Sequence, residues 1–183
     1  MKFGELDFQP ALRQPDIIAK PVFEGIKKLS EYSQEILSAQ IDPQYSDSQA
    51  FCEHYNVVPE KGANCIILEA KGGKSQFAAC LVPVNSKANI NSVIRKFLEA
   101  KSVSFSSRED AVGKTGMEFG SITIIGLPSE WPLLIDESLT KLNWMIIGGG
   151  LRTSKLLVPG KLLEHLPNAV LIPEMSTPSF NHQ

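Results

Sequence analysis

The 183-residue chain lacks the concentrated positive charge with which proteins bind nucleic acid non-specifically. Its 18 lysines and arginines are outnumbered by 20 aspartates and glutamates, and they form no basic run or tail. Non-specific binding depends on basic side chains that neutralise phosphates. The charge balance therefore argues against a DNA partner and against tight, non-specific RNA binding, but it is compatible with brief contact to the end of an RNA molecule.

Cysteine and histidine are scarce and poorly spaced for metal binding. The three cysteines, Cys52, Cys65 and Cys80, contain no CxxC pair, and no two of the three histidines have the spacing of metal ligands. Structural zinc sites need four such ligands, and an odd number of cysteines does not make a closed disulfide framework. We therefore expect no metal site, and we expect Cys65 and Cys80, which lie in apolar runs, to be buried thiols.

Long apolar runs and the common catalytic signatures are also missing. No run approaches the length of a membrane span, and the segment Met1–Asp7 lacks the apolar core of a signal peptide. The P-loop, HExxH and Ser-His-Asp patterns are absent. These absences predict a cytoplasmic protein with no membrane partner, no metal or nucleotide cofactor, and none of the usual hydrolase machinery.

What the sequence does contain is a 43% hydrophobic content, which suits a chain with a buried core. Apolar periodicity predicts helices over residues 21–38, 47–55 (with Ser46 as N-cap), 89–100 and 108–114. Apolar runs between turn residues predict strands over residues 64–70, 76–84, 103–105, 154–158 and 169–172, and further short strands within 115–152. This order predicts an α+β fold with a mixed, curved, partly barrel-like β-sheet surrounded by helices.

Three glycine-bearing turns punctuate short β-branched runs between Thr115 and Arg152. They contain Gly120, Gly126 and the triplet 148–150. Glycine lets the backbone take positive φ and lets another molecule approach the N–H groups, which can hold an anion or a polarised carbonyl. The alternative is that these are ordinary turns of a β-rich domain, and spacing alone does not decide between the two.

The order of short motifs along the chain resembles the YbaK/EbsC family. These proteins are free-standing aminoacyl-tRNA deacylases related to the editing domain of bacterial prolyl-tRNA synthetase. The matching pieces are Ala63–Ile67, Ala78–Leu81, Thr115–Gly120, Gly126–Pro128, Ile135–Asp136 and Gly149–Arg152. The resemblance implies a YbaK-like deacylase domain over residues 42–174, which leaves an N-terminal helical extension at 1–41 and a loose C-terminal tail at 175–183.

The resemblance also implies a pocket for the aminoacyl group on the terminal adenosine of tRNA. Family members use N–H groups of a glycine-rich loop to stabilise the negative charge that develops in ester hydrolysis. The matching loop here is Gly120, Ser121, Ile122, Thr123 and Ile124, with Ile124 in place of the family proline. Further substrate-binding candidates are Lys114, Asp136, Gly149, Gly150 and Arg152.

Two of these residue assignments have a structural alternative. Asp136 either contacts the ribose or amino group of the substrate, or it caps a turn. Trp131 either packs on the sheet, or it offers a face on which the terminal adenine stacks.

Position 64 is the main departure from the family, because a lysine that helps bind or orient the ester is replaced by Asn64. Asparagine donates and accepts hydrogen bonds but brings no positive charge. We expect Asn64 and Gly120 to be the catalytic positions, with Asn64 and the ribose hydroxyl of the substrate positioning a water. Substitute cations are Arg152, Lys114 and Lys155.

The sequence thus predicts a trans-editing deacylase that removes a small wrong amino acid from the acceptor end of tRNA, alone or with an aminoacyl-tRNA synthetase that holds the tRNA. The alternative is a non-catalytic module that keeps the pocket and binds an aminoacyl or nucleotide ligand, which the missing lysine and proline favour. A structural or interaction domain is a third reading. The catalytic hypothesis requires Asn64 and the Gly120 loop to face one cleft.

Overall fold

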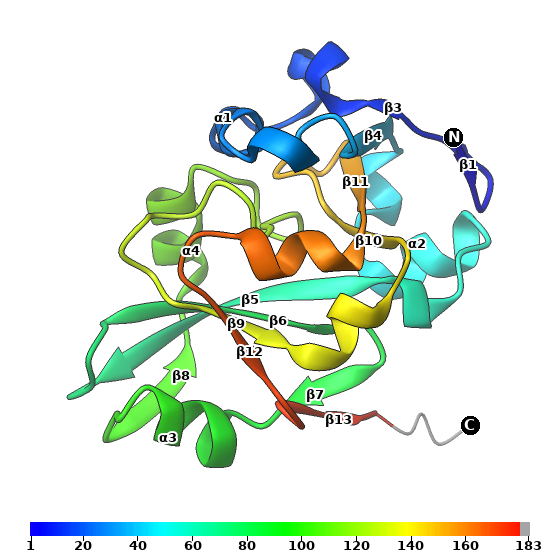
Figure 1. Cartoon of the computed structure of the whole chain (residues 1–183). Coiled ribbons are helices and arrows are strands. Elements are labelled where there is room, and N and C mark those ends of the chain that lie inside the picture. Colours follow the sequence, from blue (N-terminus) through cyan, green and yellow to red (C-terminus); the bar gives the residue numbers. More distant parts are fainter. Residues whose placement is uncertain (180–183) are drawn as a thin grey trace.

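The computed structural model describes residues 1–179, which form two main β-sheets covered by short helices and long loops (Figure 1). The larger sheet has five strands in the order β12-β9-β6-β5-β8. Strand β5 is antiparallel to both β6 and β8. Strand β9 runs parallel to β6 and β12, so the sheet is mixed. The bounds are β5 Ala63–Lys71, β6 Phe77–Pro83, β8 Ser102–Phe105, β9 Leu133–Asp136 and β12 Ala169–Ile172.

The central strand β6 separates two hydrophobic cores. Ala79 and Leu81 pack into the main core, whereas Ala78 and Cys80 pack into a smaller core on the other face of the sheet. Side chains alternate between the two faces of a strand, so a strand covered on both sides is apolar throughout. This explains the continuous apolar run that predicts the strand.

The second sheet has four antiparallel strands in the order β10-β11-β4-β3. Their bounds are β10 Met145–Gly148, β11 Ser154–Val158, β4 Leu37–Gln40 and β3 Gln9–Pro10. Two of these strands come from the first 41 residues. The prediction of a helical extension over 1–41 is therefore wrong, because this segment completes a sheet of the main domain.

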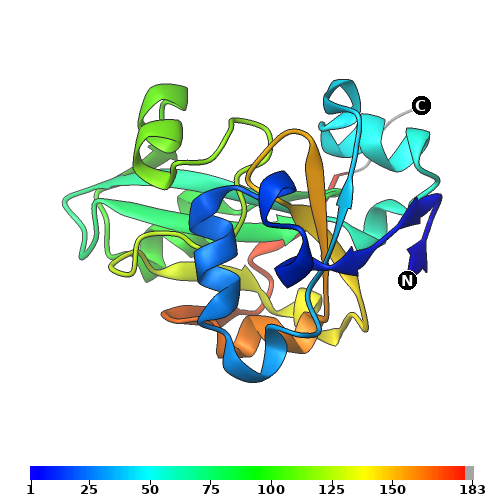
Figure 2. The same ribbon diagram turned by 90° about the horizontal axis from the view of Figure 1, so that it is seen from above.

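Only one α-helix lies in this N-terminal segment, α1 at Lys20–Lys27. Its Val22 and Ile26 join the main core, and Figure 2 shows the helix on the face turned toward the viewer. The predicted helix over 21–38 ends early because Ser30 takes a positive φ of 36° and the chain then extends into β4. Pairing of β4 with β11 overrides the helical periodicity.

The C-terminal tail is also more ordered than the sequence predicts. Strand β13, Ser176–Pro178, pairs with β7, Ser86–Ala88, and the preceding Met175 is fully buried. The prediction of a loose tail over 175–183 is wrong for these residues, because backbone pairing holds them. Its last part, residues 180–183, lies outside the described residues.

The other helices are short and have clear caps. Helix α2, Ser48–His54, begins at Asp47, whose carboxylate accepts the N–H of Gln49, so Asp47 and not Ser46 is the N-cap. Helix α4, Arg108–Thr115, ends at Gly116 with a positive φ of 64°. The predicted helix over 89–100 is a π-turn, η6 Ile90–Ile94, followed by α3 Arg95–Phe97.

The remaining elements of the described chain are a small hairpin and seven short 3-10 helices. The hairpin is β1 Lys2–Phe3 and β2 Leu6–Asp7. The 3-10 helices are η1 Ala11–Arg13, η2 Pro15–Ile17, η3 Ser30–Tyr32, η4 Pro43–Tyr45, η5 Pro59–Lys61 and η7 Glu137–Lys141, with the two-turn η8 at Gly160–His165.

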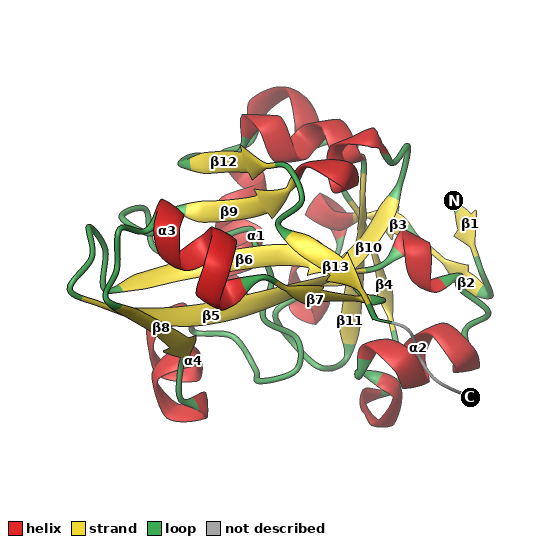
Figure 3. Ribbon diagram, turned by 90° about the horizontal axis from the view of Figure 1, so that it is seen from below, coloured by secondary structure: helices red, strands yellow, loops and turns green. Residues whose placement is uncertain are grey.

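The predicted α+β class is confirmed, with helices around a mixed five-stranded sheet and an antiparallel four-stranded one (Figure 3). Within residues 1–179 the sheets do not close into a barrel. Residues 116–132 form a long loop and not the short strands expected there. In the described part of the chain, no helix has the length and apolar composition needed to cross a membrane.

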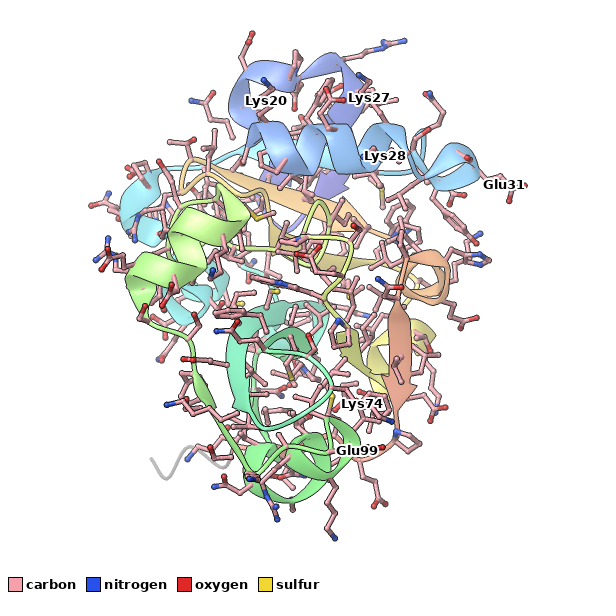
Figure 4. All side chains as sticks on the ribbon, turned by 90° about the vertical axis from the view of Figure 1, so that its left-hand side faces the viewer. Lys20, Lys27, Lys28, Glu31, Lys74 and Glu99 are labelled. Carbon is pink, nitrogen blue, oxygen red and sulfur yellow. The ribbon has the colours of Figure 1, made fainter. Side chains whose placement is uncertain are left out.

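Ion pairs contribute little to this fold. The pair Lys27–Glu24, at 3.1 Å, is exposed, and so is the pair Lys74–Glu99, at 2.5 Å, whose two residues are labelled in Figure 4. Exposed pairs are worth roughly 0–1 kcal/mol, because water and salt screen them. The fold is therefore stabilised mainly by its apolar cores and strand pairing.

Candidate active site

A cleft of about 460 Å³ lies where the start of β5 meets the N-terminal end of α2 and the Gly120 loop, residues 120–123. We call it the Asn64 cleft. Strands β10 and β11 supply another part of its wall, and Phe105 and Phe119 lie at its edge. Asn64 and Gly120 both line it, together with Ser121 and Ile122. The geometric requirement of one shared cleft is therefore met.

The side chain of Asn64 is half-buried and is oriented by α2. Its Oδ1 accepts a hydrogen bond from the hydroxyl of Ser48, the first residue of that helix. An amide has two N–H donors besides its oxygen. In the described residues these two donors have no protein acceptor, so they are available to a ligand.

The Gly120 loop approaches the sheet closely at Gly148, the last residue of β10. A Cβ at Gly148 would lie 2.4 Å from the carbonyl oxygen of Ser121, so only glycine permits this contact. The N–H of Ser121 donates to Glu118 O at 3.0 Å, and that of Thr123 points to the sulfur of Met117 at 3.4 Å. These two N–H groups are used inside the protein.

The remaining donors of the loop are different. The N–H groups of Gly120 and Ile122 make no hydrogen bond within residues 1–179. The hydroxyl of Ser121 is buried and has no partner in the described structure. Buried polar groups are nearly always paired, so unpaired ones at a cleft wall indicate where a ligand or water binds.

Lys155 is the one lysine or arginine among the described residues that lines the cleft. It is only 6% exposed, and its Nζ donates to the carbonyl of Ser46 at 2.9 Å. Nζ also lies 5.0 Å from the ring centre of Phe51. Burial lowers the pKa of Lys155 to about 8, although Cys52 and Asp47 nearby act in the opposite direction.

The structure places Asp136 outside the cleft. It is 5% exposed at the end of β9, where its carboxylate accepts Ser138 N at 3.0 Å, Ser138 Oγ at 2.6 Å and Ser176 Oγ at 2.5 Å. These bonds cap η7 and tie β13 to the sheet. The structure therefore supports the turn-capping alternative for Asp136, which does not line the Asn64 cleft.

Other substrate-binding candidates also lie away from the cleft. Thr123 is fully buried, and Gly150 packs against Ala19 and Val22 of the α1 region. Gly149 packs against the side chain of Ser154. The family resemblance implies a role for these residues, but in this structure they face the core.

Arg152 and Lys114 do not line the Asn64 cleft either. Arg152 lines a neighbouring shallow hollow with Arg108 and Phe119, and its guanidinium donates to Pro43 O at 3.0 Å. Lys114 is exposed, with Nζ 4.7 Å from the ring centre of Phe77. Because Phe119 borders both the cleft and the hollow, Arg152 lies beside the mouth of the cleft. Lys114 lines neither of them.

The aromatic residues at the cleft edge are two phenylalanines, and for Trp131 the structure supports the packing alternative. Trp131 is 4% exposed and stacks on Phe77 with ring centres 5.4 Å apart, so it packs on the sheet. At the cleft edge, Phe105 is 65% exposed and Phe119 is 47% exposed. Large exposed aromatic rings are unusual enough on a surface to mark a contact site, but no sequence motif distinguishes these two from core phenylalanines.

The thiols at the cleft are not activated nucleophiles. Cys80 is buried as predicted, whereas Cys65 is half-buried and lines the cleft together with Cys52. Burial raises the pKa of all three thiols, that of Cys80 to about 12. A thiolate is the nucleophilic form, so these cysteines are neutral at physiological pH. Residues 1–179 also contain no group of three or more Cys, His, Asp or Glu arranged to hold a metal ion.

Comparison with known proteins identifies the family and the fold. The sequence model of the aminoacyl-tRNA editing domain matches residues 42–166, which is more than half of the chain. A search of curated proteins found no match. Among solved structures, a proposed trans-editing enzyme for prolyl tRNA synthetase superposes with a TM-score of 0.72 at 13% identity, covering 85% of this chain and 94% of that one.

Two further structures share the fold. A hypothetical protein, APE2540, has a TM-score of 0.73 at 19% identity, covering 86% of this chain and all of that one. A proposed signal transduction protein from Marinobacter aquaeolei VT8 has a TM-score of 0.61 at 11% identity, covering 88% of this chain and 31% of that one. At such low identity these likenesses establish the shared fold alone.

Proposed function

Because the chain belongs to the aminoacyl-tRNA editing domain family, we propose that it hydrolyses the ester bond of a mischarged tRNA in the Asn64 cleft. The single observation that carries this proposal is the set of unused donors on facing parts of one cleft. They are the amide of Asn64, the N–H groups of Gly120 and Ile122, and the hydroxyl of Ser121. The reaction is a trans-editing step that takes place in the cytoplasm.

Ester hydrolysis needs such donors because negative charge develops on the carbonyl oxygen. A preorganised N–H donor stabilises that oxygen by roughly 3–4 kcal/mol. In our proposal the N–H groups of Gly120 and Ile122 hold the carbonyl, while Ser121 contacts the aminoacyl group. Asn64 and the ribose hydroxyl of the substrate position the attacking water.

The mouth of the cleft suits the unpaired end of an RNA strand. Single-stranded bases stack on exposed aromatic rings, and phosphates pair with arginine. Phe105 and Phe119 provide the rings, and the guanidinium carbon of Arg108 lies 5.2 Å from the ring centre of Phe119. With Arg152 in the same hollow, we propose that this edge grips the acceptor end of tRNA.

A synthetase that holds the rest of the tRNA fits the overall charge. The net charge is −2, and only Arg108 and Arg152 are basic in the hollow beside the cleft, among the described residues. Affinity for a nucleic acid grows with the number of phosphates neutralised. We therefore propose that the protein grips the acceptor end weakly and that a synthetase partner raises its effective affinity.

The second candidate is a binding module that holds an aminoacyl or nucleotide ligand without turnover. Two observations favour it. Position 64 carries no charge, and Ile124, where the family has proline, is 1% exposed in the main core and does not line the cleft. The two candidates share the cleft and differ only in whether bound ester is hydrolysed.

Incubation with a panel of mischarged tRNAs separates the two candidates. Purified protein is mixed with tRNAs carrying alanine, cysteine or serine esters, and released amino acid is measured against time. We expect release of at least one small amino acid well above the buffer rate. If no ester is hydrolysed faster than in buffer even at high protein concentration, the enzyme proposal is wrong, and ligand binding then tests the second candidate.

Substitution at position 64 tests the site within the same assay. Asn64→Ala should lower the rate at least tenfold, since it removes the amide donors. Asn143→Ala is the matched control, because Asn143 is exposed and lies outside the cleft. Asn64→Lys restores the family residue and should raise the rate, and equal rates for all three variants would show that the reaction occurs elsewhere.

A further inference from the structure

From the position of Lys155 we infer that its side chain is the catalytic cation of the Asn64 cleft, and that it stabilises the carbonyl oxygen of the bound ester. This inference rests on the proposed function and adds a residue to it. It assigns the positive charge of the site to β11, whereas Asn64 on β5 carries none.

The burial of Lys155 calls for an explanation beyond packing. Lysine is almost never buried unless it is paired, because removing its charge from water is costly. Within residues 1–179, Lys155 has no carboxylate within ion-pair distance, and one hydrogen bond to Ser46 O is its only polar contact. An ammonium has three N–H donors. Two of them therefore lack a protein acceptor at the wall of a cleft.

A purely structural side chain at this position would be apolar. The next residues of β11, Leu156, Leu157 and Val158, are fully buried. Lys155 belongs to the same strand, and its ammonium nitrogen lies 5.0 Å from the ring centre of Phe51. Retention of a charge in such surroundings is explained when a ligand supplies the missing acceptors.

The backbone brings Lys155 to the point where the other donors converge. Lys155 pairs with Gly148 in the neighbouring strand β10, and the carbonyl of Ser121 in the Gly120 loop packs directly on Gly148. On the other side, Lys155 is held by Ser46 and Asn64 by Ser48, two residues of one short turn. Lys155 is thus bracketed by both parts of the proposed site.

No neighbouring charged group in the described structure prevents the Lys155 ammonium from acting on a ligand. Asp47 is the N-cap of α2, Cys52 lies within that helix, and Arg152 comes from the loop before β11. Cys52 is a neutral thiol, and Asp47 is exposed and bonded to Gln49 N. Neither neutralises the ammonium by direct contact, so its charge can act on a ligand.

The reaction step is a simple addition and elimination. Water adds its oxygen to the ester carbonyl carbon and loses a proton, while the carbonyl electron pair moves onto the oxygen that Lys155 contacts. Collapse of this intermediate breaks the bond to the ribose oxygen, which takes up a proton. The products are the free amino acid and tRNA with its hydroxyl restored, and Lys155 ends the cycle unchanged.

The test is deacylation by Lys155→Met in the full chain, with Lys141→Met as the matched control at an exposed lysine outside the cleft. We expect kcat to fall at least a hundredfold for Lys155→Met, with KM changed less than threefold, and no change for Lys141→Met. In the wild type, the ratio of kcat to the rate of uncatalysed ester hydrolysis by hydroxide at the same pH should fall above pH 8, because the ammonium loses its proton. Lys155→Met should lack this fall.

A charge swap provides the sharpest check. Lys155→Asn combined with Asn64→Lys returns a cation to the cleft from the other strand. It should be at least tenfold faster than Lys155→Asn alone, and failure to recover any rate would show that the charge is not what matters. Denaturation curves of each variant establish that it is folded.

The outcomes separate this inference from the proposed function. An active wild type with an equally active Lys155→Met, or with the same pH profile, overturns the inference and leaves the function standing. A wild type with no activity on any ester overturns the function. Binding of 3′-alanylamino-3′-deoxyadenosine, a non-hydrolysable analogue, then decides: at least tenfold weaker binding to Lys155→Met supports the contact, and equal affinity excludes it.

Discussion

The turns at Gly120 and Gly126 look equivalent in the sequence and do different work in the structure. Both glycines have a positive φ, 88° and 82°. A Cβ at Gly120 would meet only the guanidinium of Arg152, at 3.3 Å, whereas one at Gly126 would lie 2.2 Å from the carbonyl oxygen of Pro21. The first turn is open beside a cleft, and the second is closed against a helix.

The Gly126 turn is where α1 docks. A Cβ at Gly25 of the helix would lie 2.8 Å from the N–H nitrogen of Gly126, so the two backbones touch. Val22 and Ile26 of the same helix enter the main core. A glycine turn therefore indicates a backbone conformation, and only its neighbours show whether the open space serves packing or a ligand.

The largest expected effect separates these two turns directly. Gly126→Ala should lower the free energy of unfolding by about 3 kcal/mol or more, because a positive φ costs about 1–2 kcal/mol and the new methyl group overlaps the α1 backbone. The measurement is chemical denaturation. Gly113→Ala in α4 is the control: no atom lies within 4 Å of its Cβ, and it should be stabilising by up to about 1 kcal/mol. Equal effects at the two sites would contradict the docking role.

Burial of the Lys155 ammonium at the cleft should make the free energy of unfolding depend on pH. Burial lowers the pKa of Lys155 from 10.5 to about 8, so the folded state binds this proton more weakly than the unfolded state does. Between pH 8 and 10.5 the unfolded chain holds more protons, and stability rises with pH. Relative to Lys155→Met, the wild type should therefore gain about 3 kcal/mol between pH 7 and pH 10.5.

Denaturation of both proteins at several pH values measures this difference, and the subtraction removes the titration of groups common to both. A constant difference across the range would show that the ammonium is not destabilised in the folded protein. A loss of stability relative to Lys155→Met as the pH rises would have the wrong sign for a lysine whose pKa is lowered by burial.

A smaller effect is expected at the strand end that the sequence assigned to the site. Asp136→Asn weakens three hydrogen bonds that join η7 and β13 to the sheet and should cost about 1–2 kcal/mol. Its kcat and KM for deacylation should match the wild type. A selective loss of kcat with unchanged stability would return Asp136 to the active site.

The smallest stability effect is expected at Gly120. Gly120→Ala has room for its methyl group, so only the positive φ opposes it, at a cost of about 1 kcal/mol. The deacylation rate should nevertheless fall at least tenfold, because the loop donors lie at the cleft. A loss of stability as large as that of Gly126→Ala would show that the Gly120 turn is packed as closely as the Gly126 turn.

Much of the fold follows from local patterns. The strands at 133–136, 145–148, 154–158 and 169–172 and the β5–β6 hairpin are predicted from apolar runs and turn residues. Helix α4 is predicted at residues 108–114, and in the structure it ends at Gly116. Local patterns failed at β4, where pairing with β11 decided the conformation, and at β13, where pairing with β7 did.

The site was predicted only in part for the same reason. Asn64 and the Gly120 loop share a cleft, as the hypothesis required, because both follow recognisable family motifs. Asp136, Gly150 and Lys114 were named for their position beside a turn or strand end, and each faces elsewhere. Lys155 is named from the sequence only as a substitute cation, and its place at the cleft depends on the tertiary structure.

The sequence by itself determined the α+β class, most strands, the positive-φ turns and the family, since these depend on residues close together in the chain. The tertiary structure decided which glycine turn opens on the cleft, that α1 docks on the other, and that a lysine enters the site. Each of these depends on contacts between distant residues: Pro21 with Gly126, and Lys155 with Ser46. Such contacts form only when the chain folds, so no local pattern records them.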